Sequence, residues 1–280
     1  MTHVIIGTGL LAHELKHVLG DSAVMMGRRS GVDILDYHEM KQKVGDAHPE
    51  SIMNCAAYTA VDRAEDENHL AMTVNALGAE NVARVAASFG VPLIHFSTDA
   101  VFSNEQIRTV PNELLEPSLP ETQYGQSKLL GERLVRGAYG GAHILRVANL
   151  YGEASRAWPS MLRDRLSVGV VSAECCRSVS PTWGRWVAEV AVELLKHPSG
   201  TYHVCSHGSG SWADFAERMA ALLELDWQEC VAPVAMSRVA PISDVGRLTS
   251  LLLPLRGIAV PHWYDLLLRY LQEPHTCTIS

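Results

Sequence analysis

The 280-residue sequence lacks the features that mark secreted, membrane-spanning or disulfide-rich proteins. It has no apolar run long enough to cross a bilayer, and its first residues lack the charged start and cleavage site of a signal peptide. Its six cysteines form no CxxC pair and show no disulfide-like spacing. These absences predict a cytoplasmic protein with reduced thiols and no membrane partner.

Positive charge is also scarce. Lys and Arg number 23 against 31 Asp and Glu, which gives a formal net charge of -8 at pH 7. This balance disfavours phosphate backbones and anionic lipid surfaces, so nucleic acid is not an expected partner. Repeats and low-complexity segments are absent as well. The length predicts one large α/β domain, or a core with a smaller lobe.

The start of the chain has the pattern of a dinucleotide-binding unit. Residues 4–6 predict a short strand, and an amphipathic helical pattern runs on to Leu19. Between them, Gly7 and Gly9 allow a backbone to approach a pyrophosphate, and the helix N-terminus supplies free N–H groups. A glycine turn can also join a strand to a helix without a ligand. Its position at the first strand favours the cofactor interpretation.

The end of the second predicted strand, residues 22–26, indicates which dinucleotide binds. Folds that prefer NAD usually have an acidic residue here, which binds the ribose 2′-hydroxyl. This chain has Arg28 and Arg29 instead, and guanidinium groups suit a 2′-phosphate through charge and bidentate geometry. The sequence therefore predicts NADPH, with NADH left open, against the alternative of an ordinary basic surface turn.

The central stretch of the chain carries the candidate chemistry. The apolar run 91–96 predicts a buried parallel strand that ends in hydroxyl and carboxyl groups, among them Thr98. Tyr124 and Lys128 follow, four residues apart and therefore on one helix face. Because a nearby cation makes a phenol easier to ionise, this tyrosine can act as a general acid or base near neutral pH. The pattern is typical of a ketone-reducing site, although the Tyr–Lys pair alone also fits a solvated helix face.

The other periodic segments alternate between helix and strand, which predicts a doubly wound parallel sheet. We expect a dinucleotide-binding core over residues 1–150, completed by about 179–204, and a discontinuous substrate lobe over 151–178 and 205–280. The remaining helices and strands are expected at 37–45, 51–53, 71–88, 143–147, 184–196, 200–204 and 212–223.

Two groups of residues could suggest a metal or redox site. His203, Cys205 and His207 alternate as strand ligands would, but no fourth ligand is evident. The acidic run 62–67 is better explained as a solvated helix start. We therefore predict no metal, and interpret the adjacent pair Cys175–Cys176 as packing residues.

With these motifs in place, the chain resembles the extended short-chain dehydrogenase/reductases, and among them the dTDP-4-dehydrorhamnose reductase family. The segments that carry the resemblance occur in order along nearly the whole chain: NCAAYTAVDRAE, HFSTDAVF, EPSLPETQYGQSKLLGE, ILRVANLYG, SVSPTW and GTYHVCSHGSGSWADFA. The resemblance implies reduction of a nucleotide-linked 4-keto-6-deoxysugar. In that role Tyr124 would be the proton donor, Lys128 its partner and a ligand of the nicotinamide ribose, and Thr98 the orienting hydroxyl.

The resemblance also implies which residues contact ligands. Thr98 and Asp99 would border the substrate, and a homodimer is the assembly that the superfamily suggests. The positions that match cofactor contacts of the family are Gly9, Leu10, Leu11, Asp33, Ile34, Ala56 and Ala57.

Departures from the family pattern fall on the substrate side. The glycine loop is one residue shorter than usual, Ala100 stands where an aromatic residue is common, and Asn149 replaces a substrate-facing tryptophan. Arg177 stands just before the SVSPTW segment. We therefore expect intact cofactor chemistry and a rebuilt sugar pocket, with Asn149 and Arg177 on the substrate. The triplet after the central strand lacks the glutamate of the related dehydratases, which disfavours elimination of water.

Two other functions stay open at this point. Some relatives bind a dinucleotide but act as regulatory subunits, as the methionine adenosyltransferase β subunit does. Nucleotide-sugar epimerases use the same Tyr and Lys with a tightly held NAD. Retention of Thr98, Tyr124 and Lys128 argues against the first alternative, and the Arg28–Arg29 pair argues against the second.

Overall fold

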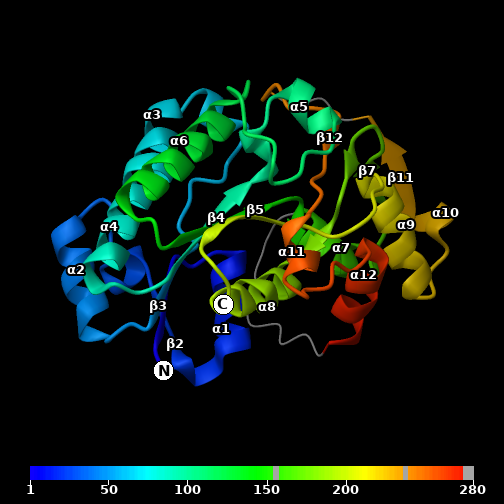
Figure 1. Ribbon diagram of the computed structural model, residues 1–280. Helices are drawn as coiled ribbons and strands as arrows, with labels where there is room; N and C mark the ends of the chain where they lie inside the picture. Colours follow the sequence, from blue (N-terminus) through cyan, green and yellow to red (C-terminus); the bar gives the residue numbers. More distant parts are fainter. Residues whose placement is uncertain (154–157, 236–238, 274–280) are drawn as a thin grey trace.

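The structure is a computed structural model that describes residues 1–153, 158–235 and 239–273. A six-stranded sheet in the order β10-β5-β4-β3-β1-β2 forms the core, and every neighbouring pair of its strands is parallel (Figure 1). Its strands are β1 His3–Ile6, β2 Ala23–Met26, β3 Ser51–Asn54, β4 Leu93–Thr98, β5 Ala142–Val147 and β10 Gly200–Val204. The predicted doubly wound sheet is confirmed. The strand order changes direction beside β1, and ligands of such sheets bind at the carboxyl ends of the strands near this point.

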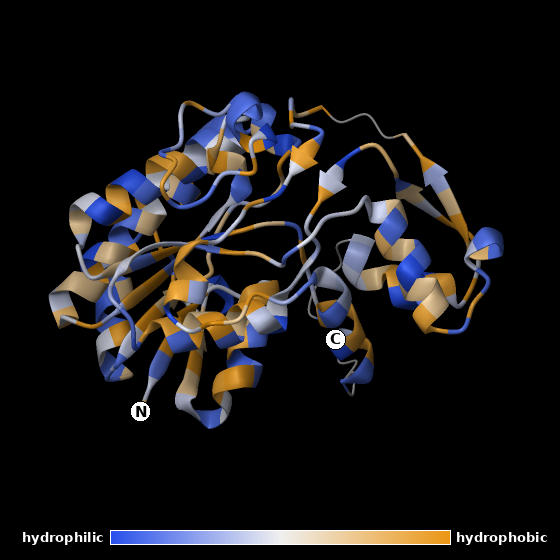
Figure 2. Ribbon diagram, turned by 45° about the vertical axis from the view of Figure 1, so that its right-hand side comes forward, coloured by the Kyte–Doolittle hydropathy of each residue, from blue (hydrophilic) through white to orange (hydrophobic). Residues whose placement is uncertain are grey.

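Helices cover both faces of the sheet because successive strand residues point to opposite sides. Ile5 and Ile94 pack into one apolar cluster with α1 and α8, whereas Val4 and Ile52 pack into another with α2 and α4. Apolar positions accordingly lie along the strands and the inward helix faces (Figure 2). The helices of the core are α1 Leu10–Leu19, α2 Tyr37–Asp46, α3 Asn68–Met72, α4 Ala79–Phe89, α6 Gln123–Ala138 and α8 Gly184–Leu194.

The helix expected over residues 71–88 is not continuous. A π-helical segment, Thr73–Gly78, separates α3 from α4. Asn75 lies buried in this widened segment; its side chain accepts a hydrogen bond from the Tyr58 amide at 2.8 Å and donates to the Ser127 hydroxyl at 2.9 Å. The Asn75 side chain therefore links the loop after β3 to helix α6.

The smaller lobe lies beside the β10 edge of the sheet, on the right in Figure 1. It contains two-stranded pairings of β11 with β7 and of β12 with β8, while β6 pairs with β9 next to the core. Its elements, with the short helix α5, are α5 Asn104–Arg108, β6 Leu150–Tyr151, α7 Trp158–Leu166, β7 Val171–Glu174, β8 Ser178–Val179, β9 Thr182–Trp183, α9 Trp212–Leu222, α10 Trp227–Cys230, β11 Val231–Val234, β12 Val245–Gly246, α11 Leu252–Leu255 and α12 Trp263–Gln272.

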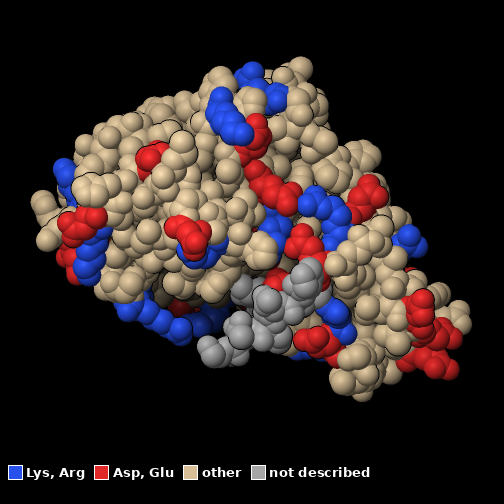
Figure 3. All heavy atoms as spheres, turned by 90° about the horizontal axis from the view of Figure 1, so that it is seen from below, with Lys and Arg blue, Asp and Glu red and all other residues tan. Residues whose placement is uncertain are grey.

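The surface carries mixed charge, and no helix among the described residues is both long and apolar enough to cross a bilayer. On the face shown in Figure 3, Lys and Arg atoms are interspersed with Asp and Glu atoms. Several of these charges pair at the surface, as Arg269 does with Glu189 at 3.0 Å. Such exposed pairs contribute little to stability.

A buried ion pair joins α6 to the sheet. Arg146, on β5, donates through Nε and Nη2 to the two oxygens of the Glu132 carboxylate on α6, at 2.9 and 2.8 Å. The Ser97 hydroxyl, on β4, donates to the same carboxylate at 2.6 Å, and both charged side chains are essentially inaccessible to solvent. These partners hold the pKa of Glu132 below its usual value against the effect of burial. The carboxylate is therefore ionised at neutral pH.

We expect loss of this pair to destabilise the fold strongly. Glu132→Gln leaves the buried Arg146 guanidinium without its counter-charge, which typically costs roughly 3–5 kcal/mol. Urea unfolding measures this loss directly. Arg136→Ala is the matched control, because Arg136 is the half-exposed partner of the same carboxylate and its removal costs about 1 kcal/mol or less. Similar losses in the two variants would contradict the assignment.

Candidate active site

Thr98, Tyr124 and Lys128, the three residues predicted to act together, come together at the carboxyl end of β4. Thr98 is the last residue of that strand, and its hydroxyl lies close enough to the Tyr124 hydroxyl to lower the pKa of the phenol. The Thr98 hydroxyl also donates to the Asp99 carboxylate at 2.9 Å. Lys128 lies one helical turn beyond Tyr124 and is buried. The sheet edge and the start of α6 thus form one polar cluster.

The start of α6 is shaped to approach this strand end. Thr122 caps the helix, its hydroxyl accepting a hydrogen bond from the Gly125 amide at 2.9 Å. A Cβ atom at Gly125 would collide with the backbone carbonyl of Ala100, in the 3₁₀ turn Asp99–Val101 that follows β4. Glycine at this position therefore lets the helix carry Tyr124 into contact with Thr98.

Lys128 is held by the sheet and does not act on the tyrosine in the expected way. Its ammonium group donates to the Phe96 carbonyl at 2.6 Å. Burial lowers the pKa of Lys128 to about 8, although the Glu132 carboxylate acts in the opposite direction. The lysine is therefore still largely cationic at pH 7, and it becomes neutral above pH 8.

The expectation that Lys128 makes Tyr124 easier to ionise is wrong for the protein without ligands. Burial and the neighbouring Asp99 carboxylate raise the pKa of Tyr124 to about 12, and the hydrogen bond with Thr98 acts against them. The phenol is thus held in its protonated form. A protonated phenol near a strand end can donate a proton to an oxygen that develops negative charge.

Asp99 and Arg177 link the catalytic strand to the lobe. The Arg177 guanidinium lies 3.9 Å from the Asp99 carboxylate and donates through Nε to the Ser243 carbonyl at 3.0 Å. Burial raises the pKa of Asp99, and Arg177 is the largest influence in the opposite direction. The contact brings together two residues that the sequence analysis predicts to bind the substrate, and that role stays a prediction.

Asn149 lies nearby but makes a different contact from the one expected. Its backbone has a φ of 51°, a left-handed conformation that asparagine tolerates better than most residues. Its side-chain amide donates to the Gly246 carbonyl on β12. Asn149 therefore connects the end of β5 to the lobe, and a substrate contact stays a prediction.

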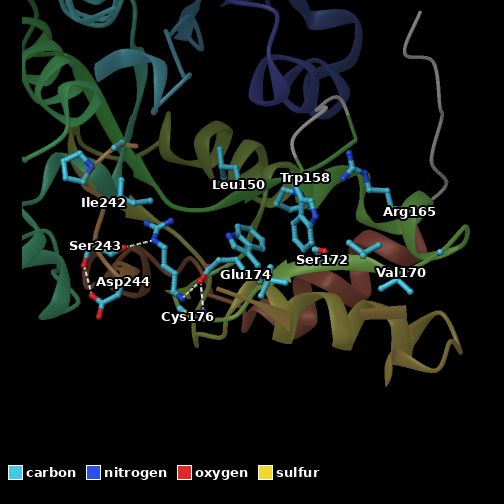
Figure 4. Close-up of a pocket in the computed structure, with 18 of the residues that line it drawn as sticks. Leu150, Trp158, Arg165, Val170, Ser172, Glu174, Cys176, Ile242, Ser243 and Asp244 are labelled. Carbon is cyan, nitrogen blue, oxygen red and sulfur yellow. Dashed lines mark hydrogen bonds between the residues drawn. The ribbon is translucent and has the colours of Figure 1, made fainter. Parts of the chain in front are cut away.

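A large cavity opens in the lobe next to Arg177. It has a volume of about 1280 Å³. Trp158 and Trp212 are aromatic members of its lining, and their rings meet edge to face with centroids 6.0 Å apart. Figure 4 shows its side chains, many of which come from α7, β7 and the 240–244 segment. The charged residues of its lining are Arg165, Glu174, Arg177 and Asp244.

A smaller hollow of about 30 Å³ has part of its lining in common with this cavity. Asp99, Ala100 and Thr122 line the hollow, and Arg177 lines both spaces. Ala100, one of the departures from the family pattern, thus faces open space beside the catalytic strand. The volume matches a water molecule or a methyl group.

The glycine turn after β1 fits a phosphate group. Gly7 has a φ of 120°, and a Cβ atom there would lie 2.8 Å from the backbone of the 55–56 peptide. A Cβ atom at Gly9 would meet no protein atom within 4 Å, so the space in front of this residue is open. No side chain caps the N-terminus of α1, which begins at Leu10. A dinucleotide pyrophosphate can therefore approach free backbone N–H groups here.

The other predicted cofactor residues surround this turn. Leu10 and Leu11 begin α1 and are half-buried; Ala56 and Ala57 lie in the loop after β3, where the Ala56 amide donates to the Asn54 side chain at 3.2 Å. That loop packs directly on Gly7. These residues therefore line the carboxyl ends of β1 and β3, the point where the strand order changes direction.

The two arginines predicted to bind a 2′-phosphate lie at the carboxyl end of β2. Arg28 and Arg29 form the exposed 3₁₀ turn Arg28–Ser30, and Arg28 lies 3.6 Å from the Asp33 carboxylate. Ile34 is buried against Gly78, where a Cβ atom would collide with it. Both guanidinium groups are free to reorient, because exposed ion pairs of this kind are weak.

His203, Cys205 and His207, which alternate along the chain, do not come together as metal ligands. His203 hydrogen-bonds the Thr249 carbonyl at 3.0 Å through its ring, and the Cys205 thiol donates to the Leu248 carbonyl at 3.1 Å. Within the described residues, no cluster of three or more His, Cys, Asp or Glu side chains could hold a metal ion.

Sequence reasoning missed the residues that hold the cluster from behind. Glu132 and Arg146 lie within the motifs QYGQSKLLGE and ILRVANLYG, and Asn75 lies in the predicted helix 71–88, but the sequence alone assigns no role to any of the three. The available signal was a Glu one turn after Lys128 on the same helix face. Its arginine partner on β5 cannot be identified without the strand pairing.

Comparison with known proteins agrees with this arrangement. The family model described as RmlD substrate binding domain matches residues 1–273. The chain is 32% identical over 249 residues to SpsK, a spore coat polysaccharide biosynthesis protein of Bacillus subtilis, with 86% of each chain covered. It is 32% identical over 215 residues to the dTDP-4-dehydrorhamnose reductase of Burkholderia thailandensis, with 71% of this chain and 69% of the relative covered.

The fold has solved counterparts of the same kind. The dTDP-4-dehydrorhamnose reductase of Bacillus anthracis, solved in complex with NADP, matches with a TM-score of 0.89 and 29% identity over 98% of this chain and 100% of that one. Fold and relatives together define an NAD(P)-dependent oxidoreductase of the extended short-chain dehydrogenase/reductase class. More specifically, the chain belongs to the RmlD substrate binding domain family, that of the dTDP-4-dehydrorhamnose reductases. The resemblance read from the motifs is confirmed.

The lowered pKa of Lys128 can be measured without knowing the substrate. The chain has five lysines, so protein labelled with ¹³C at the lysine ε-carbons gives a simple NMR spectrum. We expect one signal to titrate near pH 8, in place of the usual value of about 10.4, because burial disfavours the ammonium form. Lys128→Met should remove that signal. A Lys128 signal that titrates above pH 10 would contradict the burial argument.

Proposed function

We propose that the protein is an NADPH-dependent reductase of a nucleotide-linked 4-keto-6-deoxysugar. The observation that carries the proposal is the convergence of Thr98, the last residue of β4, with Tyr124 at the start of α6, where Thr98 influences the pKa of the phenol, and with Lys128 buried one turn away. The open space in front of Gly9 supports a bound dinucleotide at the neighbouring strand ends. Membership of a reductase family supports the reaction type.

In this proposal the side chains supply a proton and hold charge. When bound, the reduced nicotinamide supplies the hydride. Tyr124 donates its phenolic proton to the substrate oxygen, and Thr98 orients that oxygen through its hydroxyl. Lys128 supplies a fixed positive charge, which favours the phenolate that remains once the proton has left. The raised pKa of Tyr124 suits a group that must enter the reaction protonated.

The proposed cofactor contacts follow from the glycine turn and its neighbours. Gly7, Gly9 and the first amides of α1 would bind the pyrophosphate, and Arg28 and Arg29 the 2′-phosphate. Asp33 and Ile34 lie beside this basic turn. Leu10, Leu11, Ala56 and Ala57 complete the proposed set around the same strand ends. NADH remains a weaker alternative, because it lacks the phosphate that the arginines would bind.

We propose that the substrate binds in the cavity of the lobe. The proposed lobe comprises residues 151–178 and 205–280, and the edge of the core completes the substrate site. Arg177 and Asp99 lie where this cavity approaches Thr98, and Asn149 holds the adjacent β12 strand. The nucleotide-linked sugar is the only partner that we propose besides a second copy of this chain. The names of several relatives state that they act on dTDP-linked sugars. We leave open which nucleotide the substrate of this protein carries.

A binding-only role and epimerisation have less support. The three proposed catalytic side chains are retained and lie at the same end of β4 and the start of α6, which a purely regulatory subunit does not require. The solved UDP-glucose 4-epimerase of Thermus thermophilus shares 18% identity with this chain, which supports a common fold and nothing finer. Reduction is therefore the function that we propose.

Tyr124→Phe tests the proton donor. Removing the hydroxyl should lower kcat by about 10²–10⁴-fold, the usual contribution of a general acid. NADPH binding, followed by fluorescence titration, should change little, because the ring remains. Thr122→Ser, which keeps the helix cap, is the matched control and should retain activity. Unchanged turnover in Tyr124→Phe would exclude Tyr124 as the acid.

The double variant Arg28→Ala with Arg29→Ala tests the choice of cofactor. Only NADPH carries the 2′-phosphate, so its Kd should rise by about tenfold or more, which is worth 1.4 kcal/mol or above. The Kd of NADH should stay nearly the same, which provides the control within one protein. An equal loss for both dinucleotides would refute the phosphate assignment.

A further inference from the structure

Two adjacent cysteines lie at the rim of the large cavity. Cys175 and Cys176 directly follow β7; both are exposed, and their sulfur atoms lie 3.8 Å apart. The interpretation of this pair as packing residues is therefore wrong. Cys176 itself lines the cavity. Reagents in solution can reach both sulfurs without any change in the fold.

The other described cysteines differ from this pair in accessibility and not simply in a raised pKa, because the hydrogen bond with Cys175 raises the pKa of Cys176 as well. Burial raises the pKa of the Cys55 thiol strongly and that of the Cys205 thiol to about 12, so both are held in the unreactive protonated form. Cys230 is half-buried, and Cys277 lies outside the described residues. Among the described cysteines, the adjacent pair is thus the accessible one.

The turn that carries the two thiols also fixes Arg177. One oxygen of the Glu174 carboxylate accepts hydrogen bonds from the Cys176 amide at 2.6 Å and from the Arg177 amide at 2.7 Å, as the dashed lines of Figure 4 show. The Arg177 side chain then reaches the Ser243 carbonyl and the Asp99 carboxylate. A change in the 175–176 peptide would therefore move the guanidinium at the junction of the two cavities.

We propose that Cys175 and Cys176 form a thiol modification site, at which a low-molecular-weight disulfide oxidises the pair to a vicinal disulfide. The new bond would withdraw Arg177 from its position between the cavity and Asp99. The expected weakening of substrate binding rests on the proposed function, whereas the oxidation of the two thiols does not.

The chemistry is ordinary thiol–disulfide exchange. One cysteine loses its proton and attacks a sulfur of the small disulfide, which forms a mixed disulfide and releases one thiolate. The second cysteine loses its proton and attacks the cysteine sulfur of that mixed disulfide, which releases the second thiolate. The two protons pass to the released thiolates. The protein pair is oxidised, and the small disulfide is reduced to two thiols.

Ring closure must alter the backbone. Adjacent Cα atoms lie about 3.8 Å apart across a trans peptide, less than the roughly 4.4–6.8 Å that disulfides usually span. The sulfurs must also approach from 3.8 Å to a bonding distance of about 2.0 Å. We therefore expect the Cys176 amide to leave the Glu174 carboxylate. A strained disulfide is easily reduced, so the modification should be reversible.

Mass spectrometry of the whole protein treated with oxidised glutathione tests the site. We expect a product lighter by two hydrogens, with the change located on the peptide that contains residues 175 and 176, and full reversal by dithiothreitol. Hydrogen exchange at residues 174–178 should become faster in the oxidised protein. The KM for an accepted nucleotide sugar should rise several-fold, while the Kd of NADPH should not change.

Two variants control the experiment. Cys175→Ser can only form a mixed disulfide at Cys176, so it should never lose two hydrogens; Cys230→Ser should behave as the unmodified sequence does. A protein that keeps both thiols, or carries separate glutathione adducts on them, would overturn the site. A vicinal disulfide with unchanged hydrogen exchange and KM would overturn its link to Arg177. Failure of the proposed function would appear separately, as no turnover in the reduced protein.

Discussion

The buried contact between Glu132 and Arg146 is the constraint on which the candidate site depends. Because Glu132 lies one turn after Lys128 on α6, and Ser97 precedes Thr98 on β4, the same carboxylate fixes both elements that supply the proposed chemistry. Removing two charges from water is costly unless each is paired and hydrogen-bonded. Here Arg146 and Ser97 satisfy the carboxylate, so the position of helix against strand is well defined.

Burial then sets the protonation states that the site presents. It lowers the pKa of Lys128 to about 8 and raises that of Tyr124 to about 12, so at pH 7 both groups hold their protons. A site in this state has a proton to give at Tyr124 and a buried cation, Lys128, one helical turn further along α6. That combination suits reduction of a carbonyl better than removal of a proton from an alcohol. The direction proposed for the reaction therefore agrees with the electrostatics of the protein alone.

The sequence predicted the parts of the structure that follow from local patterns. The strand–turn–helix of residues 3–19, the strand 200–204 and the Tyr124–Lys128 face are local, and the structure agrees with them. Contacts between distant segments could not be predicted in this way. The hydrogen bond from Asn149 to Gly246, the π-helical segment around Asn75 and the exposure of Cys175 each depend on tertiary packing. The position of Lys128 against the Phe96 carbonyl is of the same kind, and so are the burial and the Asp99 contact that raise the pKa of Tyr124.

The proposed reaction is the reduction of a nucleotide-linked 4-keto-6-deoxysugar at this site. The direct measurement is NADPH consumption with a small panel of enzymatically prepared dTDP-, GDP- and CDP-linked 4-keto-6-deoxysugars. We expect at least one of them to be reduced, with one NADPH oxidised for each alcohol formed. Absence of consumption across the panel, in a protein that still binds NADPH, would contradict it and favour a binding or regulatory role.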